Sequence, residues 1–132
     1  MFLNYGRIVF LKKYGIINTE GDYMLENIFI ALIGVVVIII GFINRTGNVS
    51  LLHSYHRKNV SEEDKLPFGK KVGIGMIIVG ISIILLGLFG VLTLLTGKEI
   101  YYVIGTAISI IGITIGTIIA LIAIKKYNKT IF

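Results

Sequence analysis

The chain has 132 residues, of which 55% are hydrophobic and only 15% are charged. A soluble domain carries roughly a quarter of its residues as charged side chains, so most of this surface must face something other than water. There are no cysteines, which excludes disulfides, thiolate metal sites and a cysteine nucleophile.

Three apolar runs are expected to cross a membrane as helices, over residues 25–43, 72–95 and 101–124. At about 1.5 Å per residue each run can span a hydrocarbon core of roughly 30 Å. Inside lipid every backbone amide and carbonyl needs a partner, and an uninterrupted apolar run finds one only as a helix. Transmembrane strands would alternate polar and apolar residues, which these runs do not. The sequence therefore predicts an all-α protein with three transmembrane helices and a tight hairpin at 97–99.

Residues 1–23 form an N-terminal extension, and 24–132 form a single three-helix membrane domain. The extension is neither a signal peptide nor a span, because its apolar pieces are short and Lys12 and Lys13 interrupt them. Residues 20–23 can be encoded by a purine-rich ribosome-binding sequence directly before Met24. The hypothesis is that translation starts at Met24, and the alternative is a short arm outside the cell. Peptides from 1–23, found by mass spectrometry of natively expressed protein, would contradict a start at Met24.

The charge distribution predicts the orientation of the spans. The formal net charge is +6, and the basic residues gather in segment 44–71 and in the C-terminal tail. By the positive-inside rule this loop and the C-terminus are cytoplasmic, whereas the N-terminus and the hairpin are outside. The protein is expected to be a multi-pass protein of the cell membrane. Its basic residues are expected to contact lipid and not nucleic acid. Anionic headgroups are expected to contact Arg57, Lys58, Lys70, Lys71, Lys125 and Lys126.

Small residues recur at intervals of seven positions in each span. Seven residues make about two helical turns, so each set lies along one helix face, where small side chains let helices approach closely in lipid. The pattern favours packing within a three-helix bundle, and the alternative is a homo-oligomer or docking to a larger membrane protein. The expected packing residues are Gly34, Gly41, Gly73, Gly80, Gly87, Gly105, Ser109, Gly112, Gly116 and Ala120.

The loop between the first two spans is expected to carry short helical segments. Residues 50–58 are amphipathic and are predicted to lie in the headgroup plane. Ser61, followed by three acidic residues, indicates a helix start at which the serine caps free amides and Asp64 reaches back. Pro67 comes about one turn later, where it would bend or restart the helix that enters the second span.

Little in the sequence points to chemistry. From Asn27 to Ile43, and through both later spans, there is no Asp, Glu, Lys, Arg or His, and Glu26 stands at the start of the first run. Ion- or proton-coupled transport needs an ionisable group near the midplane, so a transporter acting alone is not expected. His53 and His56 are weak metal candidates, but zinc needs three or four ligands, so no metal site is predicted. No catalytic residue and no cofactor are expected, and the protein is not predicted to be an enzyme.

A string of loop residues carries a family resemblance: Gly47-Asn48-Val49-Ser50, His53, Tyr55-His56-Arg57 and Val60-Ser61-Glu62-Glu63-Asp64, followed by Gly73-Ile74-Gly75. From about Met24 onward the chain resembles a group of small bacterial and archaeal membrane proteins classed as domains of unknown function. The resemblance implies a small helical membrane protein and supplies no activity.

The predicted function is that of an accessory or structural membrane protein that acts through helix contacts and its basic loop. One alternative is a self-assembling pore former of the phage-holin kind, because three spans, an outside N-terminus and a basic tail match that layout. A second alternative is a transporter subunit or an immunity protein against a membrane-active peptide. Neighbouring genes and toxicity on induction would separate the three hypotheses.

Overall fold

The computed structural model describes the chain except residues 1–5, 7–8, 11–12, 14–18 and 130–132. Three long helices dominate it, α2 (Thr19–Arg45), α4 (Lys65–Thr96) and α5 (Ile100–Asn128), with a short helix α3 (Ser54–Arg57) between the first two. All three long helices are apolar and long enough to cross a membrane. The prediction of an all-α protein with three transmembrane helices is confirmed.

Each long helix extends beyond its predicted span. Helix α2 begins at Thr19, so Met24 lies inside this helix and not ahead of it. Part of the N-terminal extension lies outside the described residues, and the proposed start at Met24 stays a prediction. Helix α4 has 32 residues and is about 48 Å long at 1.5 Å per residue, so it projects beyond a membrane core of roughly 30 Å.

Pro67 neither bends nor restarts the entry to the second span. Helix α4 runs without a break from Lys65, with Asp64 as its N-cap residue. Pro67 is therefore the third residue of the helix, where backbone amides have no partner within the helix and the missing N–H of proline costs nothing. The prediction of a bend here was wrong because it placed the helix start at Ser61 and Pro67 deeper in the helix.

Helices α4 and α5 form the expected antiparallel hairpin. Helix α4 ends at Gly97, which has a φ of 66° and donates its backbone N–H to the Thr93 carbonyl oxygen at 2.8 Å. This left-handed backbone suits glycine and turns the chain within three residues, so that α5 begins at Ile100.

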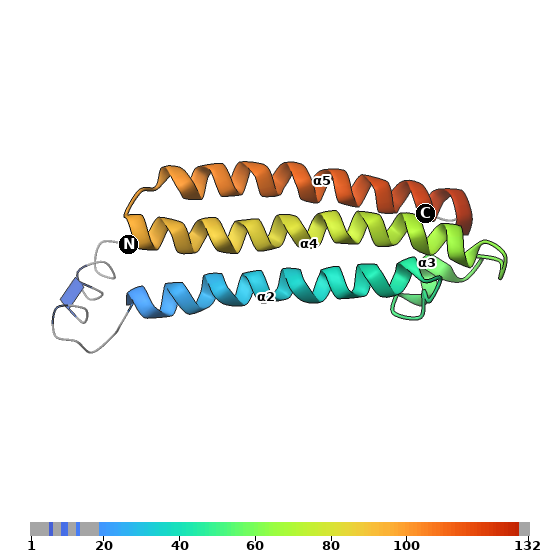
Figure 1. The fold of residues 1–132 in the computed structure, drawn as a ribbon, viewed down its shortest axis with the longest axis horizontal. Helices are drawn as coiled ribbons and strands as arrows, with labels where there is room; N and C mark the ends of the chain where they lie inside the picture. Colours follow the sequence, from blue (N-terminus) through green and yellow to red (C-terminus); the bar gives the residue numbers. More distant parts are fainter. Residues whose placement is uncertain (1–5, 7–8, 11–12, 14–18, 130–132) are drawn as a thin grey trace.

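The three helices lie in a layer with α4 in the middle, and extended contacts join α2 to α4 and α4 to α5 (Figure 1). The reason is the spacing of small residues along α4. Gly73 and Gly80 face α2, whereas Gly75 faces α5. Positions two residues apart are about 200° apart around a helix, so the two sets bind neighbours on nearly opposite sides of α4. Packing within the chain therefore gives a layer.

The contact between α2 and α4 consists of glycine pairs seven residues apart. A Cβ atom at Gly34 would lie 2.6 Å from the Gly80 carbonyl oxygen, and one at Gly41 would lie 2.9 Å from the Gly73 carbonyl oxygen. One heptad further, Gly87 packs on the backbone of Asn27. Because every pair is spaced alike, backbone meets backbone along the full interface, which is how small residues hold helices together in lipid.

In the contact between α4 and α5, small residues again let the two helix backbones approach closely. A Cβ atom at Gly75 would lie 2.5 Å from the Gly116 carbonyl oxygen and 3.2 Å from the Ala120 Cβ. Near the middle, the Ser109 hydroxyl donates to the Ser82 carbonyl oxygen at 2.8 Å, and both residues are buried. Two further glycines of α5 pack on α4 side chains, Gly105 on Phe89 and Gly112 on Ser82.

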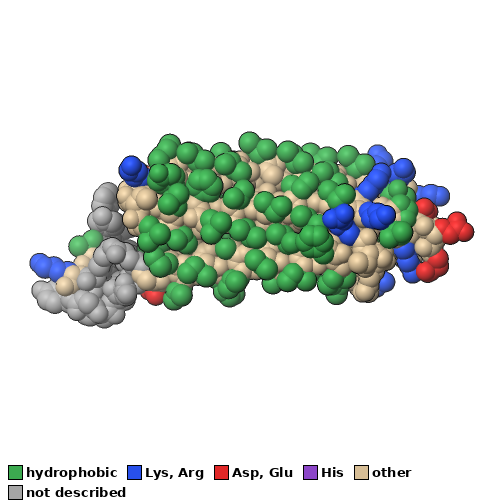
Figure 2. Space-filling model, viewed as in Figure 1, with side chains coloured by type: hydrophobic (Ala, Val, Ile, Leu, Met, Phe, Trp, Pro, Cys, Tyr) green, Lys and Arg blue, Asp and Glu red, His purple; other side chains and the backbone are tan. Residues whose placement is uncertain are grey.

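The predicted small residues thus lie at contacts between helices of the same chain. Another row of residues along α4, also seven positions apart, consists of exposed bulky aliphatic side chains: Ile74, Ile81, Leu88 and Leu95. Aliphatic side chains cover the sides of the molecule, and charged ones gather mainly near its two ends (Figure 2). This distribution is the one that a bilayer around the layer requires.

Candidate functional site: the loop cap

The best-packed part of the molecule is the end where the loop between α2 and α4 meets the C-terminal end of α5. In the described chain the buried hydrophobic side chains all lie here, and they form one cluster: Val49, Val60, Phe68, Val72, Ala123 and Ile124. Leu52, Met76 and Tyr127 pack around it. We call residues 46–64, folded over this cluster, the loop cap.

Short-range hydrogen bonds shape the first half of the loop cap. Gly47, with a φ of 86°, reverses the chain after α2, and its carbonyl oxygen accepts the Val49 N–H at 3.1 Å. The Asn48 side chain then accepts the N–H of Ser50 at 3.2 Å and its hydroxyl at 2.6 Å. His53 caps the short helix α3, since its Nδ1 accepts the Tyr55 N–H at 3.3 Å. The helical part of predicted segment 50–58 is therefore limited to Ser54–Arg57.

Asn128, at the end of α5, joins the loop cap to the membrane helices. Its Oδ1 accepts the Asn59 N–H at 2.8 Å, and its Nδ2 donates to the Tyr55 carbonyl oxygen at 2.7 Å. Its own carbonyl oxygen accepts Nδ2 of Asn59 at 3.2 Å. Asn128 is fully buried, and a buried amide is stabilising only when its polar atoms are paired, as they are here. The contacts bridge about seventy positions of sequence.

The second half of the loop cap leads into α4. The Ser61 hydroxyl accepts the Asp64 N–H at 3.3 Å and lies 2.9 Å from the Asp64 carboxylate. These two residues therefore contact each other as expected, but in the turn before α4, whose first residue is Lys65. The Lys65 ammonium forms an ion pair with Glu62 at 2.6 Å.

Basic residues surround the loop cap in two groups. The Tyr127 ring packs edge-on against Phe68 at 6.0 Å, and the Lys71 and Lys126 ammonium groups lie 5.8 and 5.3 Å from its centre. Lys70 and Lys125 are exposed beside them. Arg57 and Lys58 instead line a polar depression on the loop cap, with Lys65. On the face seen in Figure 2, Lys and Arg side chains gather near this end of the molecule, and acidic side chains lie beyond them at the tip.

The two histidines of the loop cap lie close together, with ring centres 6.2 Å apart. The Nδ1 of His53 is engaged by the Tyr55 N–H, and the Nδ1 of His56 is buried. Among the described residues no group of three His, Cys, Asp or Glu side chains could hold a metal ion. A two-histidine contact falls short of the three or four ligands that zinc needs.

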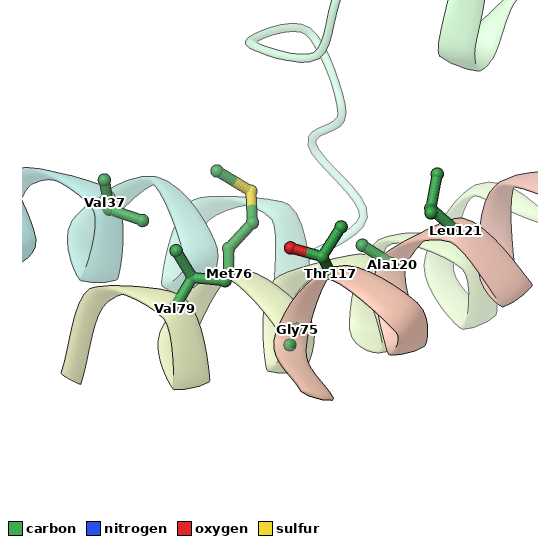
Figure 3. A pocket seen from close by; sticks show the side chains of 8 residues that line it. Val37, Gly75, Met76, Val79, Thr117, Ala120 and Leu121 are labelled. Atoms are coloured by element: carbon green, nitrogen blue, oxygen red, sulfur yellow. The ribbon is translucent and has the colours of Figure 1, made fainter. Parts of the chain in front are cut away.

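An apolar groove of about 220 Å³ runs along the face of the layer below the loop cap, with α4 as its floor and α2 and α5 as its walls (Figure 3). Val37, Met76, Thr117 and Leu121 are among its lining residues. Ala120 also lines it, so this predicted packing residue lies at the groove edge of the contact between α4 and α5. Its lining is almost wholly apolar, so the groove fits hydrocarbon chains.

Sequence reasoning missed the residues that build the loop cap, above all Asn44, Asn59 and Asn128. Asn44 is fully buried and donates its Nδ2 to the Met76 sulfur at 3.0 Å. Its backbone carbonyl leaves no room for a side chain at Gly69. A signal was present, since Asn44 and Asn128 each follow an apolar run closely, where a buried amide can close the end of a helix against a loop.

No protein-family model, no curated protein and no solved structure matches the chain. The resemblance of the loop residues to small membrane proteins of unknown function stays a prediction. The case for a function therefore depends on the loop cap and on the membrane layer that carries it.

Proposed function

We propose that this protein is a non-enzymatic accessory protein of the cell membrane, and that its loop cap is the surface that binds a partner protein. The observation that carries the proposal is the attachment of the loop to α5 through Asn128. A segment that only linked two spans would need neither a buried amide nor a hydrophobic cluster beneath it. Fixing a loop costs conformational entropy when the protein folds. A binding surface benefits from this, because a rigid surface loses less conformational entropy when a partner binds.

The three long helices support this proposal because most of their small residues already contact other helices of the same chain and are not free to bind a partner or a solute. The small residues expected to mediate docking are engaged in contacts within the chain. Some hydroxyl groups in the spans are bonded within their own helix, since Ser82 donates to the Ile78 carbonyl oxygen at 2.8 Å and Thr114 to the Ile110 carbonyl oxygen at 2.7 Å. The buried Thr106 hydroxyl has no hydrogen-bond partner in the described chain, and Thr117 lines the apolar groove. A pore of the holin kind needs a polar helix face to line it, and the exposed line along α4 is aliphatic. The accessory role is therefore favoured over the pore.

The proposed orientation places the loop cap in the cytoplasm. The described basic residues concentrate at the loop end of the layer, and the hairpin at the other end carries one residue of each sign, Lys98 and Glu99. By the positive-inside rule the loop end faces the cytoplasm. Glu63 is an exposed residue of the loop cap, so in this orientation it is accessible to cytoplasmic proteins.

A photo-crosslinking amino acid placed at position 63 or at position 98 of the tagged full-length protein tests the proposal in cells. We expect illumination to give one reproducible adduct with another protein from position 63 and none from position 98. In matched cysteine variants, Glu63→Cys and Lys98→Cys, a membrane-impermeant maleimide should label only position 98 in intact cells, because the chain has no other cysteine.

The opposite labelling pattern would refute the orientation. Adducts formed only with the protein itself, together with entry of an impermeant dye on induction, would indicate a self-assembling pore instead of an accessory protein. A protein adduct from position 98 alone would indicate that the partner binds at the hairpin.

A further inference from the structure

We infer that the loop cap and the first residue of α4 together form a discrete site for a phosphate group, lined by Ser54, Arg57, Lys58 and Lys65. These side chains, with Val60 and Glu62, line one polar depression of about 300 Å³, which is near the lower end of roughly 300–1,000 Å³ for small-ligand sites. The inference deepens the proposed function, because it names a ligand for the same loop cap and rests on that cap being fixed.

The charge of the depression favours an anion. Three cationic side chains and one carboxylate line it, which leaves a net charge of +2. Ser54 adds a hydroxyl group, which can donate to an oxyanion. Arginine and lysine together with a hydroxyl donor are the groups with which proteins bind phosphate.

Two of the three cationic groups, Arg57 and Lys65, have a partner within the protein. The Nε–H of Arg57 donates to the Leu52 carbonyl oxygen at 3.1 Å, which leaves the four N–H groups on its two terminal nitrogens for a ligand. The Lys65 ammonium is held by Glu62 at 2.6 Å and has two further N–H donors. These partners restrict the two side chains, which therefore lose less entropy on binding than unpaired surface side chains do. The Lys65–Glu62 pair lies at the surface, with side-chain exposures of 39% and 86%.

The position of the depression favours the headgroup of an anionic phospholipid as the source of the phosphate. Helix α3, which supplies Ser54 and Arg57, packs on the C-terminal end of α5, where the membrane-spanning helix ends. In the proposed orientation this is the leaflet surface that carries anionic lipids. Lys65 and Ser54 were not among the residues expected to contact lipid, and the structure adds them to Arg57 and Lys58.

The other basic residues form a separate group that serves as the internal control. Lys71 and Lys126 lie against the Tyr127 ring, and Lys125 is exposed next to Lys126. They lie outside the residues that line the depression. The double variants Arg57→Gln/Lys65→Gln and Lys125→Gln/Lys126→Gln therefore remove equal charge from the depression and from this second group.

Binding is measured on the purified full-length protein in a mild non-ionic detergent. The probes are phosphatidylglycerol, phosphatidylcholine and inorganic phosphate, followed by native mass spectrometry for the lipids and by calorimetry for phosphate. We expect saturable binding of phosphatidylglycerol that weakens at least about tenfold in Arg57→Gln/Lys65→Gln, since each lost charged hydrogen bond costs about that factor. Lys125→Gln/Lys126→Gln removes the same charge from outside the depression and should weaken this binding much less than Arg57→Gln/Lys65→Gln does.

Each outcome decides the inference. Binding of phosphatidylglycerol without inorganic phosphate identifies a lipid headgroup, whereas equal sensitivity of phosphate binding to the first double variant identifies a free phosphate ligand. Equal weakening in both double variants would show diffuse attraction and overturn the site, as would binding of phosphatidylcholine equal to that of phosphatidylglycerol. Neither assay contains a partner protein, so failure here leaves the crosslinking result untouched, and the reverse also holds.

Discussion

Replacing Asn128 by alanine is expected to detach the loop cap from α5 and to lower the free energy of unfolding by about 2–4 kcal/mol. The substitution leaves the Asn59 N–H and the Tyr55 carbonyl oxygen without the partners that the Asn128 side chain gives them. A polar group that loses its partner costs about 1–3 kcal/mol when it is buried, and these two hydrogen bonds are partly buried, so each loss falls toward the lower part of that range. The stability change is measured by denaturant unfolding in detergent.

Limited proteolysis shows where the stability is lost. In Asn128→Ala we expect cleavage within the loop cap, with the three long helices protected by the detergent micelle. The matched control is Asn48→Ala, because Asn48 is exposed and its hydrogen bonds are local, to Ser50. An Asn128→Ala protein that resists proteolysis as well as the Asn48→Ala protein does would mean that Asn128 does not fix the loop.

Replacing Gly80 by valine is expected to separate α2 from α4 and to destabilise the protein by about 3 kcal/mol, the upper end of the usual cost of overpacking. A Cβ atom at Gly80 would lie 2.6 Å from Ile38 Cγ1 and 2.7 Å from the Gly34 carbonyl oxygen. The Ile38 side chain can rotate, but the Gly34 carbonyl belongs to the backbone of α2 and cannot move alone. The helices must therefore part, and the glycine pairs on either side lose their contact too.

The control adds bulk one residue further along the same helix. Ile81 is exposed on the line of α4 that faces lipid, so Ile81→Phe should change the free energy of unfolding little. Unfolding of both variants in detergent, compared with the wild-type protein, separates close helix contact from a general effect of added volume. Equal stability of Gly80→Val and Ile81→Phe would contradict the packing described here.

The fold was largely predictable because lipid narrows the choices. Apolar runs of this length must be helices, and a three-residue connection forces α4 and α5 to be antiparallel neighbours. The layer was also implicit in the sequence, since Gly73 and Gly75 lie two residues apart and so on opposite sides of one helix. The heptad spacing alone does not show which glycine contacts which helix, and without those contacts the layer cannot be derived.

The loop cap could not be predicted to the same extent. Ser61 and Asp64 are local partners and were recognised, whereas Asn59 and Asn128 lie 69 residues apart and meet only in the folded chain. For the same reason the basic residues looked like one lipid-facing group in the sequence. Folding divides them, because α3 carries Arg57 toward Lys65 while Tyr127 lies against Lys71.

The central claim, that the loop between α2 and α4 is a fixed surface and not a linker, is tested most directly by hydrogen exchange of the wild-type protein in lipid nanodiscs. The account predicts slow exchange at Asn59 and Val60, whose N–H groups are bonded to Asn128 Oδ1 and to the Arg57 carbonyl oxygen. Glu99, in the exposed hairpin, provides the fast reference within the same molecule. Exchange at Asn59 and Val60 as fast as at Glu99 would contradict the account, since the loop would then be open chain.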